Sequence, residues 1–447
     1  MRDVLGREPH LNATTDIELY ARRLAGDSSE AASLAKLFLI TVPVLLDEAA
    51  RAIAPLRPEA LVEMGLAELE GGLVRPCARV SAYEGLVLAS DPPQDSDELD
   101  FVPGSSPAAS RVERLTVRRP VSRALDIGAG SGVQTLLAAG HSEHVVAVDV
   151  NERALEYNRF NAVLNGASNV DIRHGSWFEP VAGERFDLIV ANPPYVVSPG
   201  SDILYRDSGL PGDAVSRMLL REAPRFLEEG GFAHLMGNWV HGKDEDWRAP
   251  IEELIAGSGC DALLLKFATL DSVGYAAQWN YVMAAQGSEA LLATVDRWLG
   301  YFREEQIEAI SEVMVVLRRR SARRNWVRAI EVPVSPAKTA GDHVLRLFEA
   351  RDRRDELADD GAVLASRLTL APGAKLASWA EGPNLGDRRS NVALEHGVGF
   401  AAPVSPEIAE WLGLLDGSRR LDELANADSE TLSAVRRLFA LGLLVLP

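Results

Sequence analysis

A glycine-rich turn between two apolar stretches constrains the fold more than any other feature of the chain. Residues 122–127 alternate poorly between apolar and polar side chains and read as a buried parallel strand. The turn Gly128-Ala129-Gly130-Ser131-Gly132 follows at once, and glycine lets its backbone turn tightly and approach a ligand closely. Helical spacing over 131–139 then leads to a second apolar stretch, 145–149. This order of elements predicts an α/β domain on a doubly wound sheet, which binds ligands at the carboxyl ends of its strands.

The second apolar stretch ends in an acid, Asp149, about 20 residues after the first glycine of the turn. A carboxylate at this place in such a fold binds the ribose hydroxyls of a cofactor. Asp149 can alternatively serve only to cap the helix that begins near Asn151. We favour the ribose role, because strand, turn, helix, strand and acid occur in the expected order. The glycine turn fits NAD, FAD or S-adenosylmethionine and does not choose among them.

Another buried strand, 186–191, runs into the sequence Asn192-Pro193-Pro194-Tyr195. Two consecutive prolines fix their own φ angles and donate no N–H, and they hold the preceding asparagine extended. The result is a rigid ledge whose carbonyl oxygens and Asn192 amide oxygen can accept hydrogen bonds. Such a ledge suits a planar NH2 group, on which Tyr195 can stack. A purely structural turn is the alternative, and the preceding glycine turn makes it the weaker one.

The two motifs together resemble class I S-adenosylmethionine-dependent N-methyltransferases of the Asn-Pro-Pro-Tyr type. That group includes the glutamine N5-methyltransferases of release factors and the adenine-N6 methyltransferases. The resemblance covers about 105–330 and implies a Rossmann-like domain with a seven-stranded sheet, whose last strand runs antiparallel to the others. It also implies S-adenosylmethionine as cofactor and direct methyl transfer to the NH2 group. The cofactor-binding residues it implies are Asp126, Gly128, Ala129, Gly130, Gly132, Asp149, Asn151, Ser176, Trp177 and Asn192. The catalytic residues it implies are Asn192, Pro193, Pro194 and Tyr195.

The chain departs from the family pattern after the strand at 170–174. Related enzymes often carry an acid there, bonded to the adenine amine, whereas this chain has Ser176. A serine can still form a hydrogen bond, and Trp177 can pack on the adenine ring.

Composition places the chain among globular proteins. It is 447 residues long, which suggests about three domains. No apolar run is long enough to span a membrane, and the first residues lack the apolar core of a signal peptide. Cys77 and Cys260 are far apart and the eight histidines are scattered, so we expect neither a disulfide framework nor a metal site. These features predict a cytoplasmic protein, while its oligomeric state stays open.

The chain carries a formal net charge of −19, which weighs against a large nucleic-acid footprint, since such binding relies on Lys and Arg. The densest basic run is 318–324, followed by a looser cluster at 111–119. Because the last strand of the sheet is antiparallel, we expect the run at 318–324 to lie away from the cofactor edge. We therefore interpret this basic run as the solvent-exposed end of a strand.

The motif-bearing region, 93–332, is flanked by two further predicted domains. Residues 1–92 read as helical and winged-helix-like, with helices at 16–25, 29–41, 43–54 and 58–65 before a strand, a glycine turn and a strand. Its acidic character favours packing or substrate gripping over DNA binding. Residues 333–447 read as an α+β domain, with strands within 363–382 and 391–402 and a small leucine-rich helical core over 406–446.

Two connecting segments are candidates to cover the site. Residues 91–108 form an acidic, Pro/Ser-rich connector whose end resembles the segment that closes over the cofactor in related enzymes, although a plain linker is equally consistent. Residues 196–213 form a long loop, and loops of this length are often functional lids. Tyr205, Arg206 and Asp207 are its candidate substrate contacts, with surface ion pairing as the alternative. Residues 238–241 follow another strand and are candidates to line the pocket.

Three functions remain in competition. The first is methyl transfer to a glutamine-type amide of a protein. The second is methyl transfer to adenine in RNA or DNA, which the basic clusters and the winged-helix-like flank favour. The third is a non-catalytic scaffold that binds S-adenosylmethionine, which the intact motifs disfavour. We expect a macromolecular partner with a planar amide or amine, no membrane partner and no metal.

Overall fold

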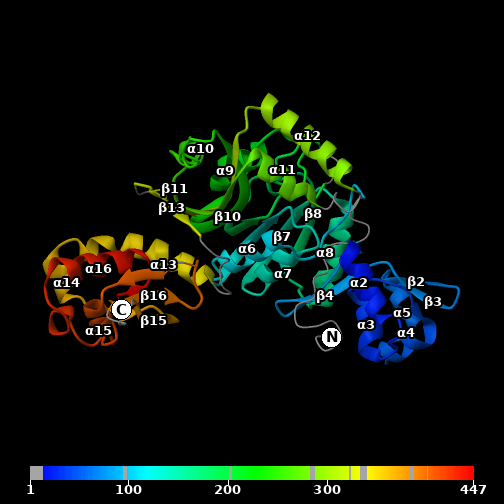
Figure 1. Ribbon diagram of the computed structural model, residues 1–447, viewed down its shortest axis with the longest axis horizontal. Coiled ribbons are helices and arrows are strands. Elements are labelled where there is room, and N and C mark those ends of the chain that lie inside the picture. Colours follow the sequence, from blue (N-terminus) through cyan, green and yellow to red (C-terminus); the bar gives the residue numbers. More distant parts are fainter. Residues whose placement is uncertain are drawn as a thin grey trace. The chain divides into compact units, whose positions relative to one another are not determined.

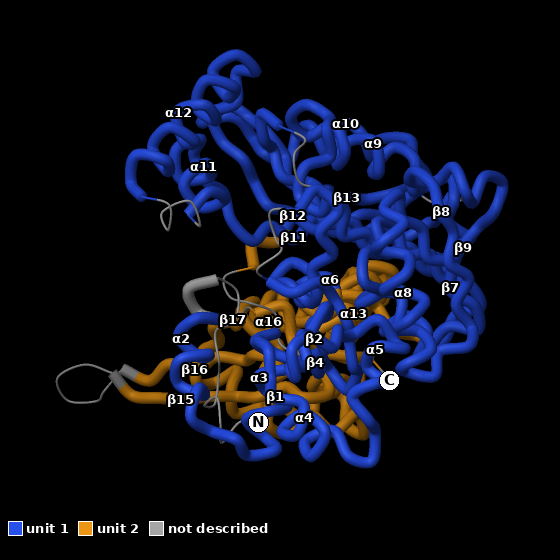
Figure 2. The backbone as a smooth tube through the Cα atoms, turned by 90° about the vertical axis from the view of Figure 1, so that its right-hand side faces the viewer, with its two compact units in different colours: residues 1–112, 120–329 blue, residues 113–119, 330–447 orange. Residues whose placement is uncertain are grey.

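The computed structural model of the protein describes residues 14–93, 98–200, 204–281, 287–321, 324–332, 340–381, 387–399 and 401–446. The chain forms two compact units (Figure 2), residues 1–112 with 120–329 and residues 113–119 with 330–447. The division into three domains at 92 and 332 stays a prediction.

The centre of the first unit is a mixed sheet, to which the labelled strands β7, β8, β10, β11 and β13 of Figure 1 belong. Its eight strands lie in the order β13-β11-β12-β10-β9-β6-β7-β8. The strands are β6 (Val121–Ile127), β7 (Ser142–Asp149), β8 (Val170–His174), β9 (Phe186–Ala191), β10 (Leu227–His241), β11 (Cys260–Asp271), β12 (Ala309–Arg319) and β13 (Val327–Glu331). The prediction of seven strands was one short. The missing strand, β13, lies at the sheet edge and none of its residues is fully buried, so no apolar pattern marks it in the sequence.

Strand directions follow the predicted pattern. β6 pairs in parallel with β7 and β9, and β12 pairs antiparallel with both β10 and β11. Arg318, near the end of β12, therefore lies opposite Phe232, early in β10. The Arg318 guanidinium forms a buried ion pair with Asp261 at 2.9 Å. The start of the basic run thus lies at the edge opposite the glycine turn, as expected, and this arginine is used within the fold.

The helices of the first unit pack into separate apolar clusters, of which the main core contains most of the buried sheet residues. Residues of α9 (Ala214–Glu222) and α10 (Ala249–Ile255) join the main core, which also contains Leu125, Ile127, Val313 and Val315 of the sheet. A second cluster contains residues of α6 (Pro107–Leu115), α7 (Val133–Ala139) and α8 (Glu152–Leu164). α11 (Ser272–Asn280) and α12 (Ser288–Glu304) pack together between β11 and β12 in the chain. This helical covering of a largely parallel sheet agrees with the predicted Rossmann-like fold.

From residue 14 on, the described N-terminal part of the first unit contains four helices and a small antiparallel sheet. The helices are α2 (Thr14–Leu24), α3 (Glu30–Phe38), α4 (Leu46–Ala52) and α5 (Pro58–Glu63). The sheet order is β1-β3-β2, from β1 (Val44–Leu45), β2 (Ala67–Glu70) and β3 (Leu73–Pro76). The predicted strand–turn–strand is present, whereas the helix predicted at 43–54 is preceded by β1. A hairpin of β4 (Arg79–Tyr83) and β5 (Leu86–Ser90) follows.

The second unit has its own core, and its described residues form two small sheets. Its helices are α13 (Ala340–Asp352), α14 (Asp360–Ala365), α15 (Pro406–Leu412) and α16 (Ser429–Ala440). Its strands are β14 (Thr369–Leu370), β15 (Ala374–Glu381), β16 (Asp387–Leu394), β17 (Ala401–Val404) and β18 (Leu444–Val445). The predicted leucine-rich core is present, with Leu412, Leu438 and Leu443 fully buried. The last leucines, however, lie in a turn and in β18 rather than in a helix.

Candidate functional site

The glycine turn and the proline ledge lie against each other. β6 and β9 are neighbours in the sheet, and Ile127 pairs with Ala191, so the turn and the ledge leave the sheet side by side. Gly128 has a φ of +69°. A Cβ atom at this position would lie 3.5 Å from the Cα of Pro193. Both the backbone conformation and the close approach therefore favour glycine here. The structure brings the two motifs together, as the sequence predicted.

Asp126 supports the glycine turn from inside the protein. It alternates with Leu125 and Ile127, which face the main core, so its side chain faces α7 and α8. Its carboxylate accepts a 2.6 Å hydrogen bond from the Thr135 hydroxyl, which in turn accepts one from the Asn158 amide at 3.1 Å. Burial raises the pKa of Asp126 to about 7, and the nearby Asp149 adds to the increase while Thr135 opposes it.

Two asparagines of α8 fix the outer part of the turn. The Asn161 amide donates a 2.8 Å hydrogen bond to the carbonyl of Ser131. Gly132 has a φ of +94°, and a Cβ atom there would lie 2.8 Å from Oδ1 of Asn158. The sequence analysis missed Thr135, Asn158 and Asn161. They lie within helices and show no local motif, so only the packing of α7 and α8 reveals their role.

Asp149 stands at the end of β7 beside the turn. Its carboxylate accepts hydrogen bonds from the backbone N–H of Gly130 at 2.8 Å and of Asn151 at 2.9 Å. Burial raises its pKa. A carboxylate has about four lone-pair sites, so two bonds leave it able to accept hydroxyl groups of a ligand.

Asn151 is the N-cap of α8, as predicted. Its side-chain oxygen accepts from the N–H of Arg153 at 3.0 Å and of Ala154 at 3.4 Å. Its amide also donates to the carbonyl of Asp100 at 2.9 Å. The capping role proposed as the alternative for Asp149 is thus filled by the Asn151 side chain.

The segment that contains Ser176 and Trp177 starts close to Asp149. The N–H of Gly175, the residue before Ser176, donates a hydrogen bond to the Asp149 carbonyl at 3.0 Å. Trp177 adopts a left-handed backbone conformation, with a φ of +51°. Such a conformation costs a non-glycine residue roughly 1–3 kcal/mol and persists where the surroundings fix it. The Trp177 side chain is half-buried against the main core. Its predicted packing on the adenine ring, and the predicted hydrogen bond from Ser176, stay predictions.

The Asn192 side chain is the most informative feature of the ledge. Its Oδ1 atom is buried and has no hydrogen-bond partner among the described residues. An unsatisfied buried acceptor costs about 1–3 kcal/mol, and a ligand N–H would remove this cost. Pro193 and Pro194 donate no N–H that could bond to this oxygen.

Tyr195, the last residue of the motif, is only 7% exposed. Burial, with the nearby Glu312 charge, raises the pKa of Tyr195 well above its usual range. The predicted stacking of Tyr195 on a bound group stays a prediction, whereas the nearby Glu312 charge is a feature that the sequence did not reveal.

The residues after the ledge are held by backbone donors. The N–H of Val196 donates to the carbonyl of Arg206 at 3.2 Å, and the N–H of Val197 donates to the Tyr275 hydroxyl at 3.0 Å. That hydroxyl also accepts from the Asn238 amide at 2.6 Å. Asn238, predicted to line the pocket, is therefore buried behind the ledge and supports it.

The candidate substrate contacts in the following loop differ from one another. Arg206 and Asp207 form a bidentate ion pair with two distances of 2.9 Å, and Asp207 is buried. The ion pairing given as the alternative is present for these two, but the pair is largely buried rather than at the surface. Tyr205 is 41% exposed, and its ring centroid lies 5.4 Å from that of Phe101.

Residues 98–104 of the connector are tied to the glycine turn. The buried Asp91 carboxylate accepts from the N–H of Val102 at 2.7 Å. The carbonyl of Pro103 accepts from the Ser131 hydroxyl at 2.9 Å. This part of the connector is therefore a fixed wall of the site rather than a plain linker.

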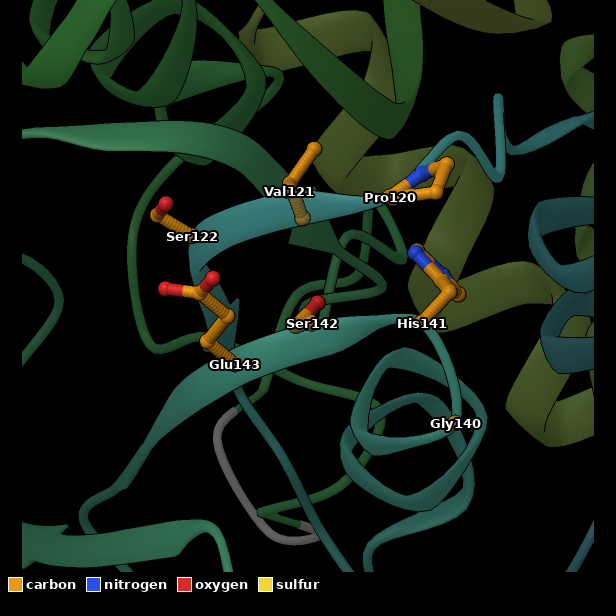
Figure 3. A pocket seen from close by; sticks show the side chains of 7 residues that line it. All are labelled: Pro120, Val121, Ser122, Gly140, His141, Ser142 and Glu143. Carbon is orange, nitrogen blue, oxygen red and sulfur yellow. The ribbon is translucent and has the colours of Figure 1, made fainter.

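A hollow elsewhere on the sheet is separate from these residues. It is lined by Pro120, Val121, Ser122, Gly140, His141, Ser142 and Glu143 (Figure 3). It lies at the amino ends of β6 and β7, whereas the glycine turn follows the carboxyl end of β6. We therefore do not assign the cofactor to it.

Over the described ranges, no group of three or more His, Cys, Asp or Glu side chains is arranged to hold a metal ion. The described helices include none that is long and apolar enough to cross a membrane.

Comparison with known proteins identifies the region that carries these motifs. Residues 108–245 match the family model described as "Methyltransferase small domain". The release factor glutamine methyltransferase of Xylella fastidiosa is 35% identical over 147 residues, which cover 30% of this chain and 52% of that protein. The ribosomal protein uL3 glutamine methyltransferase of Bradyrhizobium diazoefficiens is 36% identical over 141 residues, covering 29% and 43%. The resemblance drawn from the two motifs is confirmed over this region.

The chain spans about half the length of the curated relatives it matches. For example, the match to a release factor glutamine methyltransferase from Yersinia pestis is 33% identical and covers 34% of this chain and 58% of that protein. Among solved structures, a methyltransferase from Pyrococcus furiosus aligns with a TM-score of 0.30 and 21% identity, covering 48% of this chain and 84% of that one.

Proposed function

We propose that the chain is an S-adenosylmethionine-dependent N-methyltransferase that methylates a planar NH2 group, a glutamine-type amide of a protein. The observation that carries this proposal is the buried Asn192 oxygen, which has no hydrogen-bond partner in the part of the chain that the structure describes and lies on a ledge packed against the glycine turn. An amide NH2 group supplies the donor that this oxygen lacks. The names of the matched relatives support a glutamine acceptor.

The residues around the turn fit S-adenosylmethionine. The backbone of Gly128 approaches the ledge without a side chain between them, and the N–H of Gly130 bonds to Asp149, which keeps free acceptor sites for ribose hydroxyls. Trp177 and Ser176 follow directly beside Asp149 and would border the adenine. When bound, the cofactor supplies a methyl group activated by its sulfonium charge.

The ledge then acts by binding and orienting the acceptor. Asn192 Oδ1 and the Pro193 carbonyl each accept one N–H of the acceptor, which draws the nitrogen lone pair out of conjugation. Holding two reactants in line can contribute roughly 7–11 kcal/mol to lowering the barrier. The nitrogen gains a methyl group and loses one proton to solvent afterwards, so no strong base is required.

The charge distribution favours a protein over a nucleic acid. The net charge is −19, and Arg318 is paired with Asp261 at the edge of the sheet away from the ledge. Binding to a phosphate backbone needs unpaired cations near the site and is strongly salt-dependent.

The test uses the purified protein with radiolabelled S-adenosylmethionine and a cell extract, and then divides the product for protease or nuclease treatment. We expect label that only protease removes, on a glutamine residue identified by mass spectrometry. Loss to nuclease alone would instead identify adenine, and label that survives both would identify a small molecule. Absence of label, with cofactor binding confirmed by calorimetry, would favour the scaffold function.

Replacing Asp149 with alanine is expected to weaken S-adenosylmethionine binding. Loss of charge-assisted hydrogen bonds costs about 1.5–3 kcal/mol, which corresponds to about tenfold to a hundredfold in Kd. Calorimetry measures this change directly. Asp187→Ala is the matched control, because the Asp187 carboxylate also accepts two backbone N–H groups, those of Ser122 and Arg123, at the opposite end of the strands. Equal Kd values for Asp149→Ala and the wild type would exclude the ribose role.

A further inference from the structure

Two tyrosines on neighbouring helices hold the loop that follows the ledge. Tyr275 lies on α11 and Tyr301 on α12, and these two helices lie side by side (Figure 1). The N–H of Val197 donates to the Tyr275 hydroxyl at 3.0 Å, and the N–H of Gly212 donates to the Tyr301 hydroxyl at 2.8 Å. The two hydroxyls thus accept hydrogen bonds near the beginning and near the end of the loop 196–213.

The first residues of this loop also belong to the apolar core of α11 and α12. Val196 and Val197 are buried in one cluster with Trp298 and Tyr275. Tyr275 is 3% exposed, its ring centroid lies 6.3 Å from that of Trp298, and its hydroxyl also accepts from the Asn238 amide at 2.6 Å. Protein cores are close-packed, so a hydroxyl on a ring in such a cluster is an acceptor at a fixed position.

The loop returns to the ledge between the two hydroxyls. The N–H of Val196 donates to the carbonyl of Arg206 at 3.2 Å, and the Arg206 guanidinium carbon lies 5.7 Å from the ring centroid of Trp298 on α12. Tyr205 precedes Arg206, is 41% exposed and lies against the ring of Phe101 in the connector. The contacts with α11 and α12 therefore set where this exposed ring lies relative to the ledge.

The ledge depends on the following residues for its position. Pro193 and Pro194 have no N–H and cannot be anchored by backbone donation. Their φ angles are fixed, so a shift of the residues after them is passed on to Asn192. Val197 is fully buried, and removing the Tyr275 hydroxyl leaves its N–H as a buried donor without this acceptor. Such a donor is costly, so the backbone is expected to shift toward another acceptor.

We propose that Tyr275 and Tyr301 are positioning residues of the acceptor site. Tyr275 fixes the alignment of the ledge, and Tyr301 fixes the outer part of the loop that receives the acceptor protein. This inference rests on the proposed function. Both tyrosines lie outside residues 108–245, the region that matches the family model. Selection of the acceptor therefore depends on elements beyond the matched region.

The first test measures labelling by the full-length Tyr275→Phe variant at saturating radiolabelled S-adenosylmethionine and increasing amounts of cell extract. The change keeps the ring in the core and removes only the hydroxyl. A misplacement of about 1 Å can cost on the order of a hundredfold, so we expect the maximal labelling rate to fall by about tenfold to a hundredfold. The Kd of S-adenosylmethionine by calorimetry should stay within about twofold, because the glycine turn and Asp149 are unchanged.

Tyr301→Phe is expected to act on binding of the acceptor instead. Gly212 lies beyond Tyr205 in the loop, and the bond between Val196 and Arg206 still holds the part next to the ledge. Loss of one neutral hydrogen bond corresponds to roughly a twofold to tenfold change in an equilibrium, so the extract concentration for half-maximal labelling should rise by about this factor. The maximal rate should stay within about twofold.

Tyr83→Phe is the matched control for loss of a tyrosine hydroxyl. The Tyr83 hydroxyl bonds to that of Ser110 at 2.9 Å, and the ring packs against a different apolar cluster. We expect this variant to keep both the maximal rate and the half-saturating extract concentration of the wild type. A fall in maximal rate equal to that of Tyr275→Phe would show that general destabilisation explains both, and would overturn the positioning role.

The remaining outcomes are equally decisive. An unchanged maximal rate in Tyr275→Phe, a loss of cofactor affinity in that variant, or an unchanged half-saturating concentration in Tyr301→Phe would each overturn the inference. Circular dichroism checks that each variant is folded, and if Tyr275→Phe is not, the result for Tyr301→Phe decides. An inactive wild-type protein would instead contradict the proposed function.

Discussion

Replacing Asn192 with alanine is expected to lower kcat on the order of a hundredfold to a thousandfold, the usual cost of removing one polar group that stabilises a transition state. The side-chain oxygen is buried on the ledge and has no hydrogen-bond partner among the residues whose structure is described, so its expected partner is the acceptor N–H. The glycine turn remains intact in this variant. The Kd for S-adenosylmethionine should therefore change little, and calorimetry with single-turnover labelling measures both quantities.

Thermal stability gives this experiment a further discriminating readout. Truncating a residue that stabilises the fold lowers the free energy of unfolding of the protein. Removing an unsatisfied buried oxygen instead raises that free energy by about 1–3 kcal/mol, which offsets the lost packing. We therefore expect Asn192→Ala to melt at or above the wild-type temperature. Asn169→Ala is the control, because its amide donates to the carbonyls of Ala139 and Ser142 away from the ledge. That variant should lose stability and keep kcat. Normal turnover in Asn192→Ala would exclude the ledge as the acceptor site.

The parts of the site that the sequence predicted are local in the chain. The glycine turn, the acid after the next strand and the Asn151 cap each depend on neighbouring residues, and their order along the chain implied a sheet that places them together. The juxtaposition of Gly128 with Pro193 follows from this, because consecutive parallel strands end at the same edge.

The parts that the sequence did not predict depend on distant partners. Val197 and Tyr275 are 78 residues apart, and nothing near either residue indicates the other. Asn158 shows the same limit, since a polar residue in the middle of a helix is ordinarily solvated and only packing shows that this one is buried. Such contacts are set by tertiary structure, which local propensity does not encode.

Asp126 shows that a motif can be recognised in the sequence without revealing everything that one of its residues does. Its place before the glycines implied a contact with the cofactor, and that contact stays a prediction. Alternation along β6 turns the side chain away from the main core and toward Thr135. The carboxyl is 2% exposed and supports the turn from the interior. Its protonation should therefore be linked to the stability of the whole domain.

Substituting Asp126 with asparagine is expected to change how stability depends on pH. Burial raises the pKa of Asp126 from its ordinary value of 3.8 to about 7. Between these two values the folded protein holds a proton that the unfolded chain lacks, so the free energy of unfolding falls as pH rises. Above about pH 7 Asp126 is ionised in both the folded and the unfolded protein, so the free energy of unfolding falls no further because of this group. A shift of about three pKa units corresponds to a total loss on the order of 4 kcal/mol.

Asparagine resembles the protonated acid, because its oxygen can still accept from the Thr135 hydroxyl and it carries no charge to bury. Denaturant unfolding of both proteins from pH 4 to pH 8 measures the effect, and the difference between them cancels the titration of most other groups. We expect Asp126→Asn to gain stability relative to the wild type as pH rises toward 7, and the difference to become constant above it. A difference that is the same at pH 4.5 and pH 8 would mean that the buried carboxyl does not change its protonation on folding, and that the turn tolerates a charged Asp126.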